Sequence, residues 1–151
     1  MSKLKIVQKG DPVLRKKARE VAKITKETVK LLDQMYDVMK HAQGAGLAAP
    51  QVGIDRRVFI VDIGDGVHEF INPDIIAGGG SQIDSEGCLS VIGSTGDVER
   101  KMWIELEALD RQGKKIKIKA EGLFARVIQH EVDHLDGILF IDRAKNIEYQ
   151  E

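Results

Sequence analysis

Apolar residues recur at helical spacing in two stretches of the chain. Within residues 25–41, Val29, Leu32, Met35 and Met39 follow one another at intervals of three or four. Side chains at this spacing share one face of an α-helix. We therefore expect a helix over residues 25–41 whose methionines pack in the core.

A second helix is expected over residues 122–136, which contain no glycine or proline after the first position. Leu123, Val127, His130 and His134 form one stripe along this helix, and further apolar residues occupy the adjoining face. A helix that is apolar on two faces packs inside a protein rather than on its surface.

The chain between these helices changes to short apolar and alternating runs, which predict β-strands. The expected strands are residues 57–63, 68–72, 75–77, 102–110 and 114–120, with a turn at Arg111-Gln112-Gly113. Lys115, Lys117 and Lys119 would lie on one solvated strand face. Residues 10–15 are expected to form a turn into a short helix, because proline suits a first helical position. These elements predict an α+β fold, with antiparallel strands packed around a central C-terminal helix in a single domain over residues 1–151.

Composition and charge exclude several classes of function. The formal net charge is −1, with 42% hydrophobic and 31% charged residues, so no basic excess supports nucleic-acid binding. No apolar run approaches the roughly 18 residues of a transmembrane helix. Residues 1–9 are charged and lack the apolar stretch of a signal peptide. The one cysteine cannot form an intramolecular disulfide, and we expect a reducing, cytoplasmic setting.

The segment Gln129-His130-Glu131-Val132-Asp133-His134 contains the pattern H-E-x-x-H. On a helix the two histidines lie on one face, about 6 Å apart along the axis, where both can bind one divalent metal. Glu131 between them can act as general base on a metal-bound water. The pattern also arises by chance in ordinary helices. Unpaired histidine and glutamate are costly in a buried helix, however, so we interpret the segment as part of a metal-dependent hydrolase.

A third ligand is needed, and Cys88 is the best candidate. One large protease group has a third histidine downstream, but this chain has Phe140 at that position. Glu148 and Glu151 lie near a terminus that is expected to fray. A thiolate binds iron(II) or zinc well, although a lone cysteine is more often a buried, inert residue.

Three segments together resemble the peptide deformylases, which remove the formyl group from N-formylmethionine at the start of new bacterial proteins. They are Gly44-Ala45-Gly46-Leu47-Ala48-Ala49-Pro50-Gln51, Glu86-Gly87-Cys88-Leu89-Ser90 and the H-E-x-x-H segment. The resemblance also includes residues 10–15, Gly137 and residues 139–142, so it spans nearly the whole chain. It implies a cytoplasmic bacterial enzyme that acts on N-formylmethionyl nascent peptides, with no membrane partner. A transient contact with the ribosome stays open.

The resemblance implies that Cys88, His130 and His134 bind one divalent metal ion, with water as fourth ligand. Three protein ligands and one open position suit a catalytic centre. The metal of the family is iron(II), and zinc, nickel or cobalt can occupy the site.

The implied reaction is amide hydrolysis, in which metal-bound hydroxide attacks the formyl carbon. Glu131 would take the proton of the water and pass it to the leaving amine. The side-chain amide of Gln51 and the backbone N–H of Leu89 would stabilise the oxyanion. Gly46 would hold the substrate backbone. The apolar pocket for methionine is expected to be formed by Ala45, Leu123 and Val127, flanked by Glu86 and His130.

Other polar residues have structural interpretations. Glu86 and Arg100 are expected to form an ion pair that braces the cysteine loop, as in relatives of the family. Asp133 is expected to anchor a basic group or a backbone group, with a plain surface position equally open. His41 and His68 are interpreted as ordinary surface or loop residues.

The chain departs from the family pattern at two prolines. Ile92 and Glu99 stand where relatives commonly have proline. We expect the loop that contains them to be more flexible as a result, and contacts with the peptide beyond methionine to be affected. The expected ligands and catalytic groups are unchanged.

Two alternative functions stay open. A metallo-amidase or peptidase would retain the metal and Glu131 but act on another N-acyl or small formamide substrate. A metal-binding protein without catalysis is disfavoured by the combination of Glu131, Gln51 and Leu89, because a structural metal site needs neither a base nor an open position.

Overall fold

The computed structural model describes residues 4–149. The first three residues of the charged N-terminal stretch and Glu151 lie outside this range. The two longer helices are α1 (Lys26–His41) and α2 (Gly122–Leu135), and three short 3₁₀-helices are η1 (Pro12–Arg15), η2 (Ala49–Val52) and η3 (Phe140–Asp142). None of the helices within residues 4–149 is long and apolar enough to cross a membrane.

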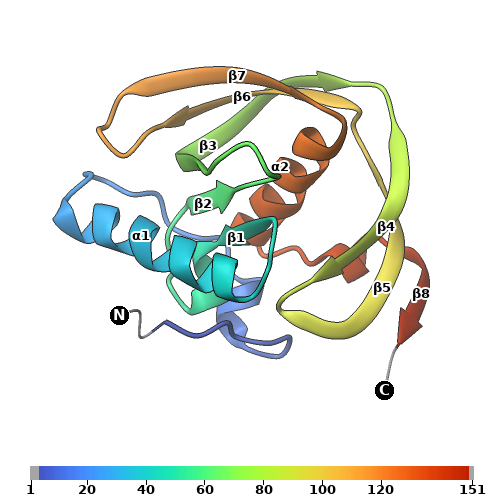
Figure 1. The fold of residues 1–151 in the computed structure, drawn as a ribbon. Helices are drawn as coiled ribbons and strands as arrows, with labels where there is room; N and C mark the ends of the chain where they lie inside the picture. Colours follow the sequence, from blue (N-terminus) through green and yellow to red (C-terminus); the bar gives the residue numbers. More distant parts are fainter. Residues whose placement is uncertain (1–3, 150–151) are drawn as a thin grey trace.

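The strands form two antiparallel sheets. The larger sheet has the order β1 (Gly46–Ala48), β2 (Val58–Val61), β3 (His68–Gly79), β6 (Trp103–Leu109) and β7 (Lys115–Glu121). The smaller sheet has the order β4 (Gln82–Cys88), β5 (Val91–Arg100) and β8 (Lys145–Tyr149). Figure 1 shows α2 in the middle of the molecule, with the smaller sheet to one side of it. The predicted α+β fold around a central C-terminal helix is confirmed.

Strand β2 lies between the two helices and shows how the core is built. Phe59 and Val61 point to the side of the sheet where α2 packs, and Val58 and Ile60 point to the side where α1 packs. Successive side chains of a strand face opposite sides of a sheet. A strand covered on both faces is therefore apolar at every position, which explains its sequence Val-Phe-Ile-Val.

Both long helices agree with the sequence-based expectation. Helix α1 follows Thr25, whose backbone N–H donates to the Thr28 hydroxyl at 3.2 Å, and it buries Leu32, Met35 and Met39. The hairpin of β6 and β7 has its turn where predicted, and η1 begins at the expected proline. Segments with regular apolar spacing thus adopt the secondary structure that this spacing predicts.

Strand β3 differs from its prediction. We expected two short strands, at residues 68–72 and 75–77, and the structure has one strand of 12 residues. Its pairing with β6 shifts register between Ile71 and Asp74, where Asn72 adopts a φ of +51° and Pro73 follows. The register shift interrupts the alternation of apolar and polar residues from which a strand is predicted.

Cys88 was expected in a turn after a strand, and the turn begins one residue later, at Leu89. The segment with Ile92 and Glu99 was expected to be a flexible loop, and this is wrong. Cys88 is the last residue of β4, and the segment with Ile92 and Glu99 is strand β5. The side chain of Ile92 is 77% exposed and Glu99 is exposed as well. Non-proline residues keep their N–H groups for pairing in a strand, so the departures from the family pattern do not create a loop here.

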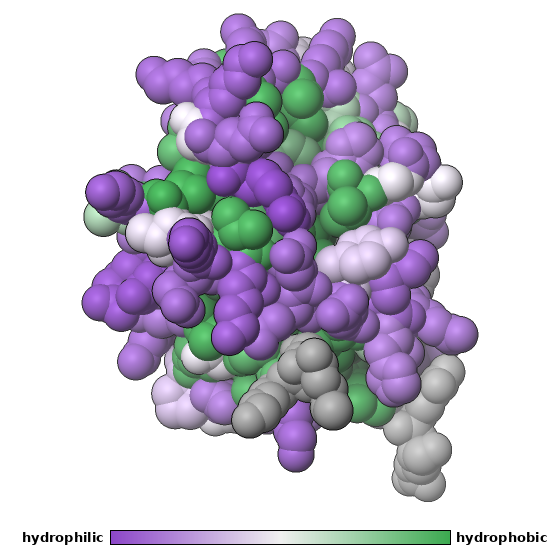
Figure 2. Space-filling model, turned by 60° about the vertical axis from the view of Figure 1, so that its left-hand side comes forward, coloured by the Kyte–Doolittle hydropathy of each residue, from purple (hydrophilic) through white to green (hydrophobic). Residues whose placement is uncertain are grey.

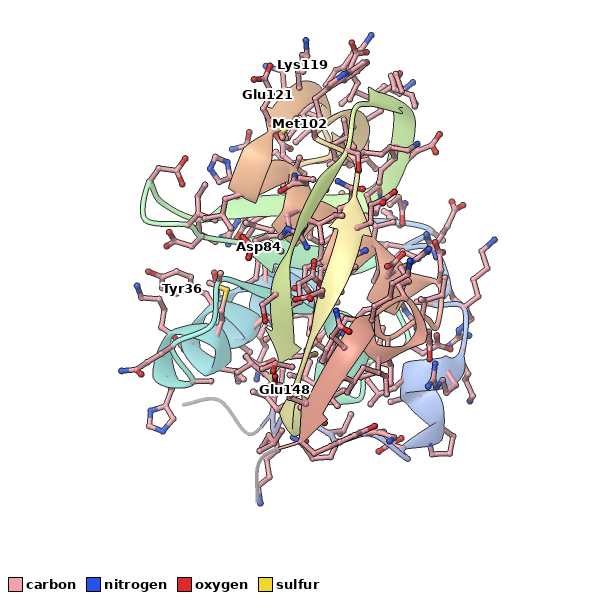
Figure 3. All side chains as sticks on the ribbon, turned by 90° about the vertical axis from the view of Figure 1, so that its right-hand side faces the viewer. Tyr36, Asp84, Met102, Lys119, Glu121 and Glu148 are labelled. Carbon is pink, nitrogen blue, oxygen red and sulfur yellow. The ribbon has the colours of Figure 1, made fainter. Side chains whose placement is uncertain are left out.

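Strands β7 and β8, each at one edge of its sheet, carry exposed charged side chains, including the predicted lysines at 115, 117 and 119. Figure 3 shows Lys119 and Glu121 at one end of the molecule and Glu148 on β8 near the other. Charged side chains at an edge discourage pairing with another chain. Strand β8 was not predicted. The face drawn in Figure 2 is largely hydrophilic, with apolar side chains in small separate areas.

The isolated histidines lie where expected. His41 is exposed in the last turn of α1. His68 is partly exposed at the start of β3, and its Nε2 lies 3.2 Å from Asp65 Oδ2. Its ring also lies 4.8 Å from that of Phe124, a contact that the sequence did not predict.

We predict that Gly137→Ala destabilises the protein more than Gly113→Ala. Both glycines have a left-handed φ, +76° and +81°. A Cβ at Gly137 would lie 2.6 Å from the carbonyl oxygen of Arg15, whereas a Cβ at Gly113 meets nothing closer than 3.8 Å. Gly113→Ala should lower the free energy of unfolding by about 1 kcal/mol, and Gly137→Ala by at least about 2 kcal/mol. Urea denaturation measures both, and equal losses would contradict the tight packing of η1 on this turn.

Candidate metal centre and active site

Helix α2 presents both histidines of the H-E-x-x-H pattern toward the smaller sheet. His130 and His134 are buried, and their ring centroids are 5.0 Å apart. The end of the helix is fixed by the Leu135 carbonyl, which accepts from the Ala18 N–H at 2.7 Å and from Arg57 Nη1 at 2.9 Å. The last turn of the helix, which carries His134, is therefore held in place.

Strand β4 brings Cys88 to these histidines. Its Sγ lies 3.3 Å from His134 Nε2 and accepts from the Ser90 N–H at 3.4 Å. One nitrogen from each histidine and this sulfur all lie within 4.8 Å of one another. Two imidazoles and one thiolate are a donor set that suits zinc or iron(II). The structure thus brings together the three residues that were expected to be metal ligands.

Glu86 orients the first of the two histidines. Its Oε1 lies 2.8 Å from His130 Nδ1. Because an ionised carboxylate can only accept, Nδ1 carries the hydrogen, which leaves Nε2 free for a metal. Burial would raise the pKa of Glu86, but hydrogen bonds from Arg100 and His130 hold it well below its usual range. Glu86 is therefore a permanent anion beside His130.

The surroundings shift the pKa values of the two histidines in opposite directions. Burial lowers the pKa of His134 well below its usual value, so its imidazole is neutral, as a metal ligand must be. Burial also opposes a charge on His130, but its hydrogen bonds with Cys88 and Glu86 raise its pKa to about 10. Surroundings that stabilise a positive charge between His130 and Cys88 would equally stabilise a divalent cation there, so the residues fit the metal.

Glu131 lies beside the cluster and also lines the cavity that opens there. Its side chain is buried, and Oε1 has no hydrogen-bond partner among the residues that the structure describes. Burial raises its pKa to about 7. A Cβ added at Gly46 would lie 2.6 Å from Oε2, so only glycine leaves room for the carboxylate. A buried, unpaired carboxylate is costly, which indicates a functional role.

Gln51 directs its amide nitrogen toward the cluster. Its Oε1 accepts from the Ala48 N–H at 2.9 Å, which leaves Nε2 to approach Ser90 Oγ at 3.3 Å and Cys88 Sγ at 3.6 Å. Leu89 follows Cys88 in the turn between β4 and β5. Both residues are therefore near the expected position of a reacting carbonyl.

A cavity of about 450 Å³ opens beside the cluster. Its lining includes nearly all expected site residues: Ala45, Gly46, Gln51, Glu86, Cys88, Leu89, Leu123, Val127, His130 and Glu131. Leu123 is 59% exposed. His134 is fully buried and is not part of the lining. Glu86 lines the cavity, but its carboxylate is hydrogen-bonded to His130 and two arginines. Its main contact is therefore with the histidine.

A network of buried charges adjoins this cavity, and two of its members, Glu86 and Arg126, are part of the lining. Arg100 binds Glu86 through Nε and Nη2, as expected, and its Nη1 binds Asp133 at 2.7 Å. Asp133 also accepts from Arg143 at 2.8 and 3.0 Å. Asp133 therefore anchors basic groups, which was one of its two predicted roles. Arg126 was not singled out from the sequence, although a charged residue one turn before His130 on a buried helix was a usable signal.

Comparison with known proteins gives the family. A family model described as polypeptide deformylase matches residues 3–150. The peptide deformylase of Pelotomaculum thermopropionicum is 54% identical over 147 residues, which are 97% of this chain and 95% of that protein. The crystal structure of peptide deformylase from Thermotoga maritima has a TM-score of 0.92 at 41% identity, covering 94% of this chain and 97% of that one.

A second similar structure is described as bound to a peptide. It is a class I type b peptide deformylase from Acinetobacter baumannii, described as bound to Met-Ala-Ser, with a TM-score of 0.88 and 33% identity. The match covers 93% of this chain and 97% of the Acinetobacter baumannii chain. The chain described here belongs to the polypeptide deformylase family, a family of metal-binding hydrolases.

Proposed function

We propose that this chain hydrolyses the formyl amide of N-formylmethionine at the N-terminus of newly made polypeptides and releases formate. The observation that carries the proposal is the buried carboxylate of Glu131, which lacks a hydrogen-bond partner among the described residues and adjoins the Cys88, His130 and His134 cluster. A structural metal site needs no such base.

The cluster of Cys88, His130 and His134 would hold one divalent ion. We propose iron(II) as the native ion, with zinc, nickel or cobalt able to take its position. When bound, the ion supplies Lewis acidity and lowers the pKa of a coordinated water from about 15.7 toward 7. Glu86 keeps the hydrogen of His130 on Nδ1 and thereby directs Nε2 to the ion.

Glu131 moves the proton in this reaction. It takes a proton from the attacking water and gives it to the amine nitrogen as the carbon–nitrogen bond breaks, which leaves formate and a free amine. The Gln51 amide and the backbone N–H of Leu89 donate to the oxygen that becomes negative. One such donor typically contributes about 10²–10³ in rate.

The cavity offers one place for each part of the substrate. Gly46 lies against Glu131 and has no side chain, so a peptide backbone can approach closely there. The methionine side chain would contact Ala45, Leu123 and Val127 on the wall of the cavity. The Acinetobacter baumannii protein described as bound to Met-Ala-Ser supports a peptide that begins with methionine.

We further propose that the chain acts as one catalytic domain over residues 1–151 in the bacterial cytoplasm. Its partners would be N-formylmethionyl nascent peptides. This setting follows from the substrate, because formylated nascent chains emerge where proteins are made.

Formate release from N-formyl-Met-Ala-Ser tests the proposal, with anaerobically prepared, iron(II)-loaded protein. Glu131→Gln keeps the size of the side chain but removes the base, so activity should fall by about 10²–10⁴ while metal content stays at the wild-type level. N-acetyl-Met-Ala-Ser in a parallel assay distinguishes a general amidase. Release of acetate as fast as formate would favour that alternative, and full metal occupancy without formate release would exclude deformylation.

A second prediction concerns the space beside Glu131. Gly46→Ala would place a methyl carbon 2.6 Å from Glu131 Oε2 and 2.9 Å from Val127 Cγ1. The carboxylate must then shift by several tenths of an ångström, and misplacement near 1 Å costs about 10²-fold. We expect kcat/KM for N-formyl-Met-Ala-Ser to fall by about 10–10², with the melting temperature and metal content measured alongside. Unchanged kcat/KM in a folded, metal-loaded variant would contradict the role assigned to Glu131.

A further inference from the structure

Arg126 is a buried arginine that the proposed reaction does not use. It is 5% exposed and lies one helical turn before His130 on α2. Its Nη1 donates to Glu86 Oε2, and its remaining donors reach Gln82 Oε1 at 3.3 Å and the carbonyl oxygens of Gln82 and Val98 at 3.2 and 2.9 Å. Burying a guanidinium is costly unless its donors are engaged, so this position requires a specific arrangement of both neighbouring strands.

Arg126 completes the contacts of the Glu86 carboxylate. Oε1 accepts from His130 Nδ1 and Arg100 Nη2, each at 2.8 Å. Oε2 accepts from Arg100 Nε at 2.8 Å and from Arg126 Nη1. A carboxylate has about four acceptor positions, and here all four are occupied. Loss of the Arg126 donor would leave one acceptor position of Oε2 empty and remove one of the four contacts that fix the carboxylate against His130.

The geometry couples helix α2 to strand β4 at the metal cluster. Arg126 and His130 are four residues apart on one helix face, and both bind the same carboxylate of β4. Cys88 lies two residues after Glu86 on that strand. The double contact therefore controls how closely the strand with the sulfur approaches the helix with the two imidazoles.

We propose that Arg126 is a positioning residue for the metal centre. Through Glu86 it keeps His130 in the orientation that directs Nε2 at the metal, and it holds Cys88 at the matching distance. The inference rests on the proposed metal cluster but not on the identity of the substrate. The competing explanation is that Arg126 only joins β4 and β5 to the helix and contributes to stability alone.

Arg57 provides a matched control for that explanation. It is also a largely buried arginine that anchors α2, through the Leu135 carbonyl and Asp136, each at 2.9 Å. No hydrogen bond or ion pair connects its side chain to Glu86, Cys88, His130 or His134 within the described residues. In Arg57→Met the Leu135 carbonyl keeps its hydrogen bond from the Ala18 N–H at 2.7 Å, which still holds the turn that carries His134. Arg57→Met should therefore lower stability without altering the metal centre.

The experiment compares cobalt(II)-loaded wild type, Arg126→Met, Arg126→Lys and Arg57→Met. The thiolate-to-cobalt absorption band reports the Cys88 contact, and the rate of cobalt loss to excess EDTA reports retention, both at a temperature where circular dichroism shows each variant folded. We expect Arg126→Met to lose cobalt about 10–100-fold faster than wild type, with a shifted band. Arg126→Lys keeps the charge and one donor, so its loss rate should lie between those of wild type and Arg126→Met.

Arg57→Met should show the wild-type band and the wild-type rate despite a lower melting temperature. Wild-type band and rate in both Arg126 variants would overturn the inference, and equal acceleration in Arg126→Met and Arg57→Met would overturn it as well. Absence of a thiolate band in the wild type would instead contradict the proposed metal cluster, so the two failures are distinguishable.

Discussion

The buried carboxylate of Glu86 is the contact on which the site depends. It joins strand β4, which ends at Cys88, to helix α2, which carries His130 and His134. Ionised groups are stable inside a protein only when they are paired and hydrogen-bonded. The arginines around Glu86 and Asp133 meet this requirement, and as a result they fix the relative position of the two elements that supply the metal ligands.

The larger sheet and the helices create the setting for this contact. Strand β2 is covered by α1 on one face and by α2 on the other, so α2 is a core helix with little freedom to move. Its C-terminal end is anchored by Arg57, and Gly137 allows the chain to turn tightly against Arg15. The site is therefore held by rigid elements on both sides, which suits groups that must keep a fixed geometry.

The parts of the molecule that could be predicted from the sequence are those with local causes. Helices α1 and α2 follow from apolar spacing, and the histidine pair follows from the helix itself. Strand β5 was missed because it is rich in glycine, serine and threonine and so lacks a clear alternating apolar pattern. Arg126 was missed for a different reason. Its partner Glu86 is 40 residues away in the chain, and no local pattern connects the two.

X-ray absorption spectroscopy of the zinc-loaded protein tests the central claim most directly, because it reports the atoms bound to the metal without reference to activity. The geometry predicts one sulfur near 2.3 Å and two imidazole nitrogens near 2.0–2.1 Å in the first shell. The sulfur signal should disappear in Cys88→Ser. A first shell without sulfur in the wild type, or with a single imidazole, would contradict the assignment of Cys88, His130 and His134 as one metal site.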